Sequence, residues 1–320
     1  MTSTMVTVVQ PGLTTVQDLG RPGWARLGVA ANGAGDQHAA TVASVLVGNS
    51  PGSPVLEVTA TAMSFSLDRP ALVAVTGAAE EVTVDGHPQP VWQPLVVPAG
   101  ATVSVAEPTH GLRSYVALRG QLVAPRTLGS VAPDPVLGVG TRLAAGDRVE
   151  VRTDFEGLDH PHTRIPVFRL AVDRPALRPE LTVEVTPGPE ADQFASHALA
   201  GRFEVTAESD HVGMRLVGEA PPRRGDAEIL SRGVPVGAVQ VPPGGGVLVL
   251  LRGRLVTAGY PVAAVATSVG VDRLAQARPG DVVSFRPVSV AAAVEQVRRR
   301  AAAMEALAAR AGEALRAAGV

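Results

Sequence analysis

Short apolar segments rich in valine recur along the first half of the chain, and each is closed by Gly, Pro or Asp. Segments of this length and spacing are typical of strands in an all-β barrel or sandwich. The sequence Val-Asp-Gly at 84–86 is a hairpin-turn signal. The long alternating helices that a doubly wound sheet requires are missing, so we expect a mainly β fold. The predicted strands occupy residues 5–12, 54–60, 62–67, 71–78, 81–86, 94–108, 112–120 and 144–152.

The second half repeats this arrangement. Residues 181–194 open it as 6–19 open the first, with a strand, a Pro-Gly pair and a polar turn. Residues 277–287 close it as 144–152 close the first, with a Gly-Asp turn before a last strand. We therefore predict two related β-barrel domains, at 1–155 and 166–288, separated by a segment that contains Pro and His.

Two segments have helical rather than strand periodicity. Residues 36–49 begin with Asp36 as a candidate N-cap and end at Gly48. Residues 289–320 form an alanine-rich extension that we expect to be a helix packed on the outside or against a partner. Its basic run at 298–300 is interpreted as a solvated face. The apolar residues in helical register are Val290, Val294, Val297, Met304 and Leu307.

Composition excludes several functions. The 320 residues carry a net charge of −2, which leaves no basic field for nucleic acid. No apolar run is long enough to cross a bilayer and no signal peptide is recognised, so we expect a cytoplasmic protein. Cysteine and lysine are both absent, since all 28 Lys+Arg residues are arginine. The chain therefore has no thiolate nucleophile, no lysine for a phosphate loop and no lysine that could carry biotin.

The glycine-rich stretch at 11–36 is the first candidate site. It holds Asp18, Arg21, Arg26 and Asp36 in a chain with only 18% charged residues. Its last residues, Asn-Gly-Ala-Gly-Asp, lead into a predicted helix, where free backbone N–H groups favour an anion or a polarised carbonyl. The alternative is a plain connecting loop. A dinucleotide fingerprint is excluded because His38 stands where its last glycine would be.

A second polar concentration lies at 207–219. Ser209, Asp210 and Arg215 form a patch between predicted strands; the alternative is a turn capped by Asp210, with Arg215 on the surface. Gln240 alternates with two valines, which indicates either a buried structural amide or a substrate contact.

Thr257, Gly259 and Tyr260 lie in a loop of small residues that would allow a ligand to approach closely. His160 and His162 could form a metal pair, but a solvated linker is the better interpretation, and we expect no metal site. No Gly-x-Ser-x-Gly nucleophile elbow is present.

Segments spread over residues 6–290 resemble, in order, those of the biotin-dependent carboxyltransferase family. This family includes the KipA proteins, allophanate hydrolase subunit 2 and the 5-oxoprolinase component PxpC. The segments are PGLTTVQDLGRPGWARLGV at 11–29, NGAGDQHAATVASVLVGN at 32–49, RSYVALRG at 113–120, SDHVGMRL at 209–216, GAVQVPP at 237–243, GYPVAAV at 259–265 and LAQARPGDVVSFRPV at 274–288.

The resemblance implies two cyclophilin-like β-barrels with an active site between them. It implies two partners, a KipI/PxpB-like protein and a PxpA protein of the LamB/YcsF type. Such a complex opens 5-oxoproline to glutamate with ATP, which the partners would bind or share. The alternatives are an amide or urea carboxyltransferase that uses biotin on a separate carrier, and a noncatalytic KipA-like regulator of a KipI-like protein.

The site hypothesis combines the two polar concentrations. Asp36 or Asp210 would orient or deprotonate a nucleophile. Arg113, Arg215, Gln240 and the backbone after Gly33 would stabilise developing negative charge. The residues expected to bind substrate are Asp18, Arg21, Gly33, Arg113, Ser209, Thr257, Gly259 and Tyr260.

The chain departs from the family pattern at several charged positions. His211 stands for an arginine, Arg232 for an acid, Gly253 for an acid and Ala258 for a glycine. Residues 32–36 read Asn-Gly-Ala-Gly-Asp in place of Ser-Gly-Ala-Met-Asp. These departures leave an altered substrate or a lost activity open as alternatives for this member.

Overall fold

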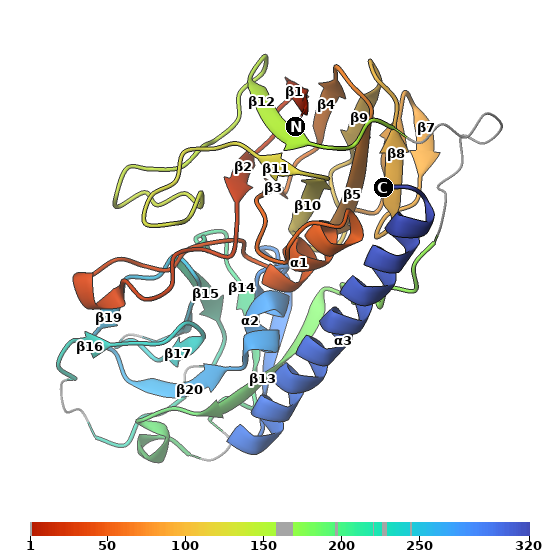
Figure 1. Ribbon diagram of the computed structural model, residues 1–320. Helices are drawn as coiled ribbons and strands as arrows, with labels where there is room; N and C mark the ends of the chain where they lie inside the picture. Colours follow the sequence, from red (N-terminus) through yellow and green to blue (C-terminus); the bar gives the residue numbers. More distant parts are fainter. Residues whose placement is uncertain (1, 158–168, 196–197, 220, 226–228, 244) are drawn as a thin grey trace. The chain divides into compact units, whose positions relative to one another are not determined.

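The computed structural model describes residues 2–157, 169–195, 198–219, 221–225, 229–243 and 245–320 (Figure 1). These residues form two compact units that interleave along the chain. The first comprises Met1–Gly20, Gln37–Ala176 and Ala302–Val320, and the second comprises Arg21–Asp36 and Leu177–Ala301. The predicted domain boundaries at 1–155 and 166–288 stay predictions, because these units are not contiguous in the sequence. The predicted linker histidines, His160 and His162, lie outside the described residues.

The first unit contains two antiparallel sheets around one apolar core. Val6, Phe65, Val103 and Val151 of one sheet pack with Leu56 and its neighbours of the other. The seven-stranded sheet has the order β11 (Gln121–Leu122), β12 (Arg148–Thr153), β1 (Thr2–Gln10), β4 (Met63–Leu67), β9 (Thr102–Val105), β6 (Val82–Val84) and β7 (His87–Gln89). The five-stranded sheet has the order β2 (Thr14–Gln17), β3 (Val55–Thr59), β10 (Arg113–Leu118), β5 (Ala71–Gly77) and β8 (Pro94–Val97).

Local signals in this unit are confirmed. Asp85 and Gly86 connect β6 to β7 with φ of 49° and 77°, the left-handed pair that a tight hairpin needs. Helix α1 (Gln37–Leu46) follows Asp36 directly and buries its apolar side against β5 and β10. The hydroxyl of Thr76 on β5 donates to the carbonyl of Ala39 at 2.7 Å, which ties the helix to the sheet.

The second unit is a closed barrel. Phe203 and Phe285 lie in its core with ring centroids 5.7 Å apart. Around the barrel run β13 (Glu180–Pro187), β20 (Val262–Ala266), β17 (Ala238–Gln240), β18 (Val247–Leu250), β15 (Gly213–Val217), β14 (Arg202–Val205) and β21 (Val282–Pro287). Outside it lie the ribbon β16 (Arg232–Gly233) and β19 (Thr257–Ala258), the short helices η1 (Ala25–Leu27) and η2 (Ala191–Gln193), and α2 (Ser268–Leu274).

In each half the first strand pairs with the last, but the relative direction of the two paired strands differs between the halves. The opening and closing strands pair in both, as the repeated sequence pattern suggests. In the first half β1 and β12 are antiparallel, whereas in the second β13 and β21 are parallel. The halves are therefore not repeats at the level of strand direction.

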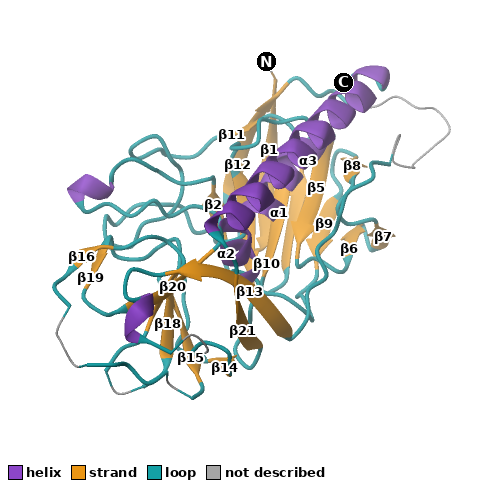
Figure 2. Cartoon of the chain, turned by 90° about the horizontal axis from the view of Figure 1, so that it is seen from below, coloured by secondary structure: helices purple, strands orange, loops and turns teal. Residues whose placement is uncertain are grey.

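The C-terminal segment is helical, as expected: α3 spans Val290–Ala317 (Figure 2). The predicted apolar register is only partly buried, because Val290, Val294 and Val297 are exposed. The buried positions are Leu307, Ala311 and Leu315, which all belong to the first unit. Among the described residues, no helix combines the length and apolar character that crossing a membrane requires.

Candidate functional site

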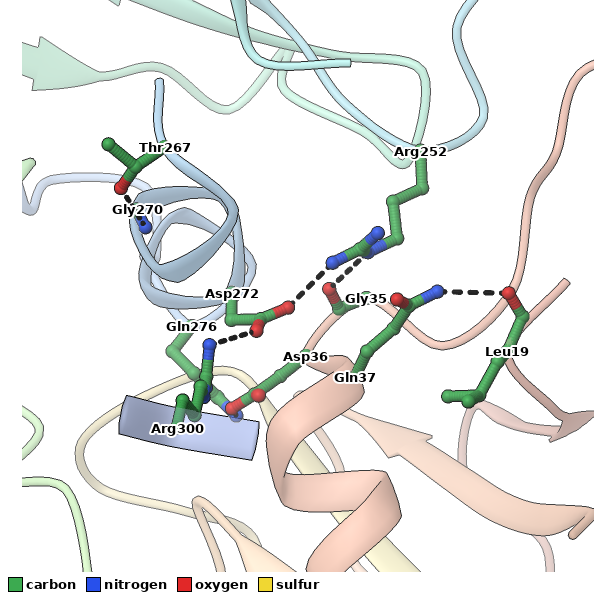
Figure 3. Close-up of polar contacts among 10 residues, drawn as sticks. All are labelled: Leu19, Gly35, Asp36, Gln37, Arg252, Thr267, Gly270, Asp272, Gln276 and Arg300. Atoms are coloured by element: carbon green, nitrogen blue, oxygen red, sulfur yellow. Dashed lines mark hydrogen bonds and ion pairs between the residues drawn. The ribbon is translucent and has the colours of Figure 1, made fainter. Parts of the chain in front are cut away.

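Residues 32–36 contact the loop that follows β18 within the second unit. The backbone N–H of Asn32 donates to the carbonyl of Arg252 at 3.2 Å. The Nε of Arg252 in turn donates to the carbonyl of Gly35 at 3.0 Å (Figure 3). Two segments more than 200 positions apart are therefore held together by reciprocal contacts.

Charged groups surround this contact. Arg252 donates through its second amino group to Asp272 Oδ1 at 2.7 Å, and Arg300 of α3 donates to Asp272 Oδ2 at 2.7 Å (Figure 3). Asp36 accepts the side-chain amide of Gln276 at 2.9 Å. Asp272 is thus shared by two arginines, and one of these arginines binds the 32–36 turn.

Helix α2 positions both partners of this cluster. Thr267 caps it, since its Oγ1 accepts the N–H of Gly270 at 3.1 Å. Asp272 lies on the last turn of α2, and Gln276 lies in the turn that follows the helix, where its N–H donates to the carbonyl of Arg273 at 3.0 Å. The sequence interpretation missed this helix, although Thr267 followed by Val271 and Leu274 is a cap with apolar residues at helical spacing.

The backbone of the 32–36 turn can supply hydrogen-bond donors. Asn32 and Gly33 both have positive φ, 53° and 95°, so the chain bends sharply. Gly33 and Ala34 are buried, yet their N–H groups take part in none of the hydrogen bonds of the described residues. Buried amides usually have a partner, and two without one suit an oxyanion or a polarised carbonyl.

Gly253, in the loop after β18, lies against both His211 and Asn32. Its N–H donates to the carbonyl of His211 at 3.0 Å. A Cβ at this position would come within 2.6 Å of His211 Cδ2 and 3.1 Å of Asn32 Oδ1. The imidazole of His211 therefore fills the space where a side chain at position 253 would start.

The patch at 209–215 is a turn capped by Asp210 with Arg215 at the surface, which is the alternative that the sequence left open. Asp210 Oδ1 accepts the N–H groups of Val212 and Gly213 at 2.8 and 2.9 Å and so caps a turn. Ser209 bonds the backbone of Arg215. The Arg215 side chain is 58% exposed and lies 3.8 Å from Glu208. The structure does not bring Arg215 to Asp36, which contacts α2, and the catalytic roles of Asp210 and Arg215 stay predictions.

The third predicted group lies on the barrel. Gln240 is buried and its amide donates to the carbonyl of Tyr260 at 3.3 Å. Tyr260 is partly exposed, and Thr257 lies on the ribbon β16–β19. Gly259 lies close to the carbonyl of Ile229, so a side chain there would be crowded. These residues all belong to the second unit, and their contact with substrate is likewise a prediction.

Three other predicted substrate-binding residues, Asp18, Arg113 and Arg21, are all buried. Asp18 is buried in the first unit, where it accepts the Ser130 hydroxyl at 2.5 Å and the Val131 N–H at 3.0 Å. Arg113 is also in the first unit, with its Nε 3.6 Å from Glu57. Arg21 is buried in the second unit and its N–H donates to the carbonyl of Ala31, closing the loop ahead of the 32–36 turn.

One sequence interpretation is corrected. Residues 298–300 were expected to be a solvated face, but Arg300 is only 26% exposed and pairs with Asp272. Successive helical residues point about 100° apart, so Arg299 remains at the surface beside Glu295 while Arg300 turns towards α2. In the described part of the chain, no group of three His, Asp or Glu side chains could hold a metal ion.

Comparison with known proteins adds a family model, described as carboxyltransferase domain, subdomain A and B, that matches residues 27–287. The chain is 30% identical to the C subunit of 5-oxoprolinase from Escherichia coli (strain K12), over 91% of this chain and 94% of that protein. It is 26% identical to urea amidolyase of Saccharomyces cerevisiae, over 89% of this chain and 17% of that one. The crystal structure of TTHA0988 is similar with a TM-score of 0.77 and 32% identity, over 88% of this chain; this chain spans only 56% of that one.

Proposed function

We propose, from the premise that this chain belongs to the family of the carboxyltransferase domain, subdomain A and B, that it is the C subunit of an ATP-dependent 5-oxoprolinase. The observation that carries the proposal is the likeness to the C subunit of the Escherichia coli 5-oxoprolinase, which covers 91% of this chain and 94% of the relative. The likeness to urea amidolyase covers 89% of this chain and 17% of that protein.

The geometry of the second unit fits lactam hydrolysis. When water attacks the ring carbon of the phosphorylated lactam, negative charge develops on the lactam oxygen and its phosphoryl group, and this charge needs fixed donors. We assign this role to the N–H groups of Gly33 and Ala34. Asp36 follows them in the chain and is held by Gln276, so we assign it to orient the water and take its proton.

The nucleotide belongs with the partner proteins in this proposal. ATP, when bound, would transfer its γ-phosphoryl group to the lactam oxygen and leave as ADP. Water would then add to the ring carbon, and the C–N bond would break as the ring nitrogen takes a proton. A second water would release phosphate from the resulting acyl phosphate to give glutamate. This chain contains no lysine to contact its phosphates. The same absence means that the chain could act as a biotin-dependent carboxyltransferase only with biotin on another chain. We therefore propose that KipI/PxpB-like and PxpA-like proteins complete the enzyme.

The test is reconstitution of the complex. We expect glutamate to form from 5-oxoproline only when this chain, the PxpB-like and PxpA-like proteins and ATP are all present. Urea carboxylation that depends on bicarbonate and a biotin carrier would instead establish the carboxyltransferase alternative. A stable complex with a KipI-like protein that turns over neither substrate would indicate the regulatory alternative.

The same assay tests Asp36. Asp36→Asn should lower kcat about 100-fold because a general base contributes roughly 10²–10⁴-fold. Asp281→Asn is the matched control: Asp281 also accepts a hydrogen bond, from the Arg278 N–H, but in a turn before β21. Equal activity of the two variants would remove Asp36 from the mechanism.

A further inference from the structure

Arg254 is a half-buried cation with an unusual set of partners. It follows Gly253 in the loop after β18, and its backbone N–H donates to the carbonyl of Leu251 at 3.1 Å. Its Nε donates to the carbonyl of Val234 at 2.9 Å. That carbonyl is neutral, so the positive charge of the guanidinium is not balanced there.

No carboxylate among the described residues forms an ion pair with Arg254. Burial alone lowers the pKa of this guanidinium, because removal from water disfavours the charged form. An arginine side chain nevertheless remains protonated at neutral pH. A half-buried cation without a counter-ion is a suitable partner for an anionic ligand, which would supply the missing negative charge.

The neighbouring arginines are already neutralised. Arg252 pairs with Asp272, and Arg232 on β16 donates to both carboxylate oxygens of Glu190 at 2.5 Å. Arg254 is linked to the backbone near both, because its Nε bonds Val234, the residue after β16, and it follows Arg252 by two positions in the chain. Of these three arginines, Arg254 is the one that lacks a carboxylate partner.

The position of Arg254 connects it to the candidate site. Gly253, its neighbour in the chain, packs against His211 and Asn32, and Arg252 holds the carbonyl of Gly35. An anion at Arg254 would therefore lie beside the loop that contacts the 32–36 turn. A small molecule with an amide at the turn and a carboxylate nearby would use both features.

We propose that Arg254 binds the carboxylate of the substrate and so selects a lactam that carries a carboxylate over a neutral amide. The proposal rests on the proposed function. 5-Oxoproline has a ring carboxylate, whereas urea has none. A guanidinium suits this group, because its planar N–H donors match the two carboxylate oxygens.

The test compares two lactams in the reconstituted enzyme: 5-oxoproline and 2-pyrrolidinone, the same ring without the carboxylate. Arg254→Met should lower kcat/KM for 5-oxoproline about 100-fold, the loss of a charge-assisted pair. It should leave the much slower turnover of 2-pyrrolidinone within about twofold of wild type, and Arg254→Lys should recover part of the loss. Equal loss on both lactams would overturn the proposal, since Arg254 would then only support the loop.

Arg273→Met is the matched control. Arg273 also donates to one backbone carbonyl, that of Thr182, but it is exposed and lies outside the 252–254 loop. We expect this variant to keep the wild-type preference for 5-oxoproline.

Binding without ATP separates this proposal from the proposed function. In equilibrium dialysis of the assembled complex, Arg254→Met should raise the Kd for 5-oxoproline at least about 10-fold. Wild type that binds 5-oxoproline through Arg254 but forms no glutamate would overturn the function and keep the carboxylate contact. An unchanged Kd in Arg254→Met would overturn the contact whatever the turnover.

Discussion

The absence of a side chain at Gly253 lets two loops meet. His211 and Asn32 approach the backbone of this residue so closely that a Cβ would lie 2.6 Å from the imidazole Cδ2. Gly253 does not have positive φ, so its requirement is for space rather than for a special backbone conformation. Residue 253 must therefore stay small while His211 and Asn32 keep these positions.

Gly253→Ala should therefore destabilise the protein by about 1–3 kcal/mol, the usual cost of overpacking. Urea unfolding monitored by circular dichroism measures it. Gly233→Ala is the control, because Gly233 also lacks positive φ and a Cβ there meets nothing within 4 Å. We expect that variant to match or slightly exceed wild type. A Gly253→Ala protein as stable as Gly233→Ala would show that the loops can separate without cost.

At the scale of elements, α3 joins the barrel through charged groups rather than through its exposed valines. Arg300 meets Asp272 at the end of α2, and Gln296 donates to Glu184 on β13. Glu184 also pairs with Arg286 on β21. The first half of the helix is thus fixed by two carboxylates, and one of them also orients Arg252 towards Gly35.

Removing Asp272 should be costly because it would leave two arginines without their counter-charge. We expect Asp272→Ala to lower the free energy of unfolding by about 3–5 kcal/mol. Arg299→Ala, which removes an exposed partner of Glu295 on the same helix, should change it by no more than about 0.5 kcal/mol. Calorimetry of the two variants measures both effects. A small effect of Asp272→Ala would mean that Arg252 and Arg300 find other partners or water.

Glu184 should make stability depend on pH in the acid range. The hydrogen bond from Gln296 and the charge of Arg286 lower the pKa of Glu184 below its usual value. A carboxyl whose pKa is lower in the folded state contributes its stability above about pH 4.3 and loses it as pH falls through the folded pKa. Glu184→Gln should therefore flatten the acid limb of unfolding midpoints measured between about pH 6 and 3. An unchanged acid limb would exclude this contribution.

At the scale of the whole molecule, each of the two units is built from segments that are not contiguous in the sequence. Residues 21–36 leave the first half of the sequence and belong to the barrel of the second unit, while the end of α3 belongs to the first unit. The candidate donors of the 32–36 turn therefore lie with the barrel that also holds Gln240 and Arg254. The reconstitution experiment belongs to this scale, since it tests whether partner proteins supply the phosphate-binding and biotin-carrying lysines that this chain does not contain.

The sequence by itself indicated the mainly β character of the chain and two of the three α-helices of the described residues. Valine-rich segments closed by turn residues predicted β3, β4 and β5 to within one residue at each end, because period and turn chemistry are local. It also pointed to residues 32–36 as backbone donors, since glycines before a helix are a local signal as well. Short α2 was missed, because seven residues after a strand give little periodicity.

Only the tertiary structure decided which charges meet. Asp272 pairs with residues 20 positions before it and 28 after it, and Arg252 reaches Gly35, 217 positions away. No periodicity encodes such pairs, because they form only when the closed barrel brings its loops to α2 and α3. The same folding places no carboxylate of the described residues in an ion pair with Arg254. The sequence around Arg254 does not reveal this, because it depends on which distant residues surround the side chain. The local pattern of apolar and turn residues determines the local conformation. The burial of a charged side chain and the identity of its counter-charge depend on how distant segments pack.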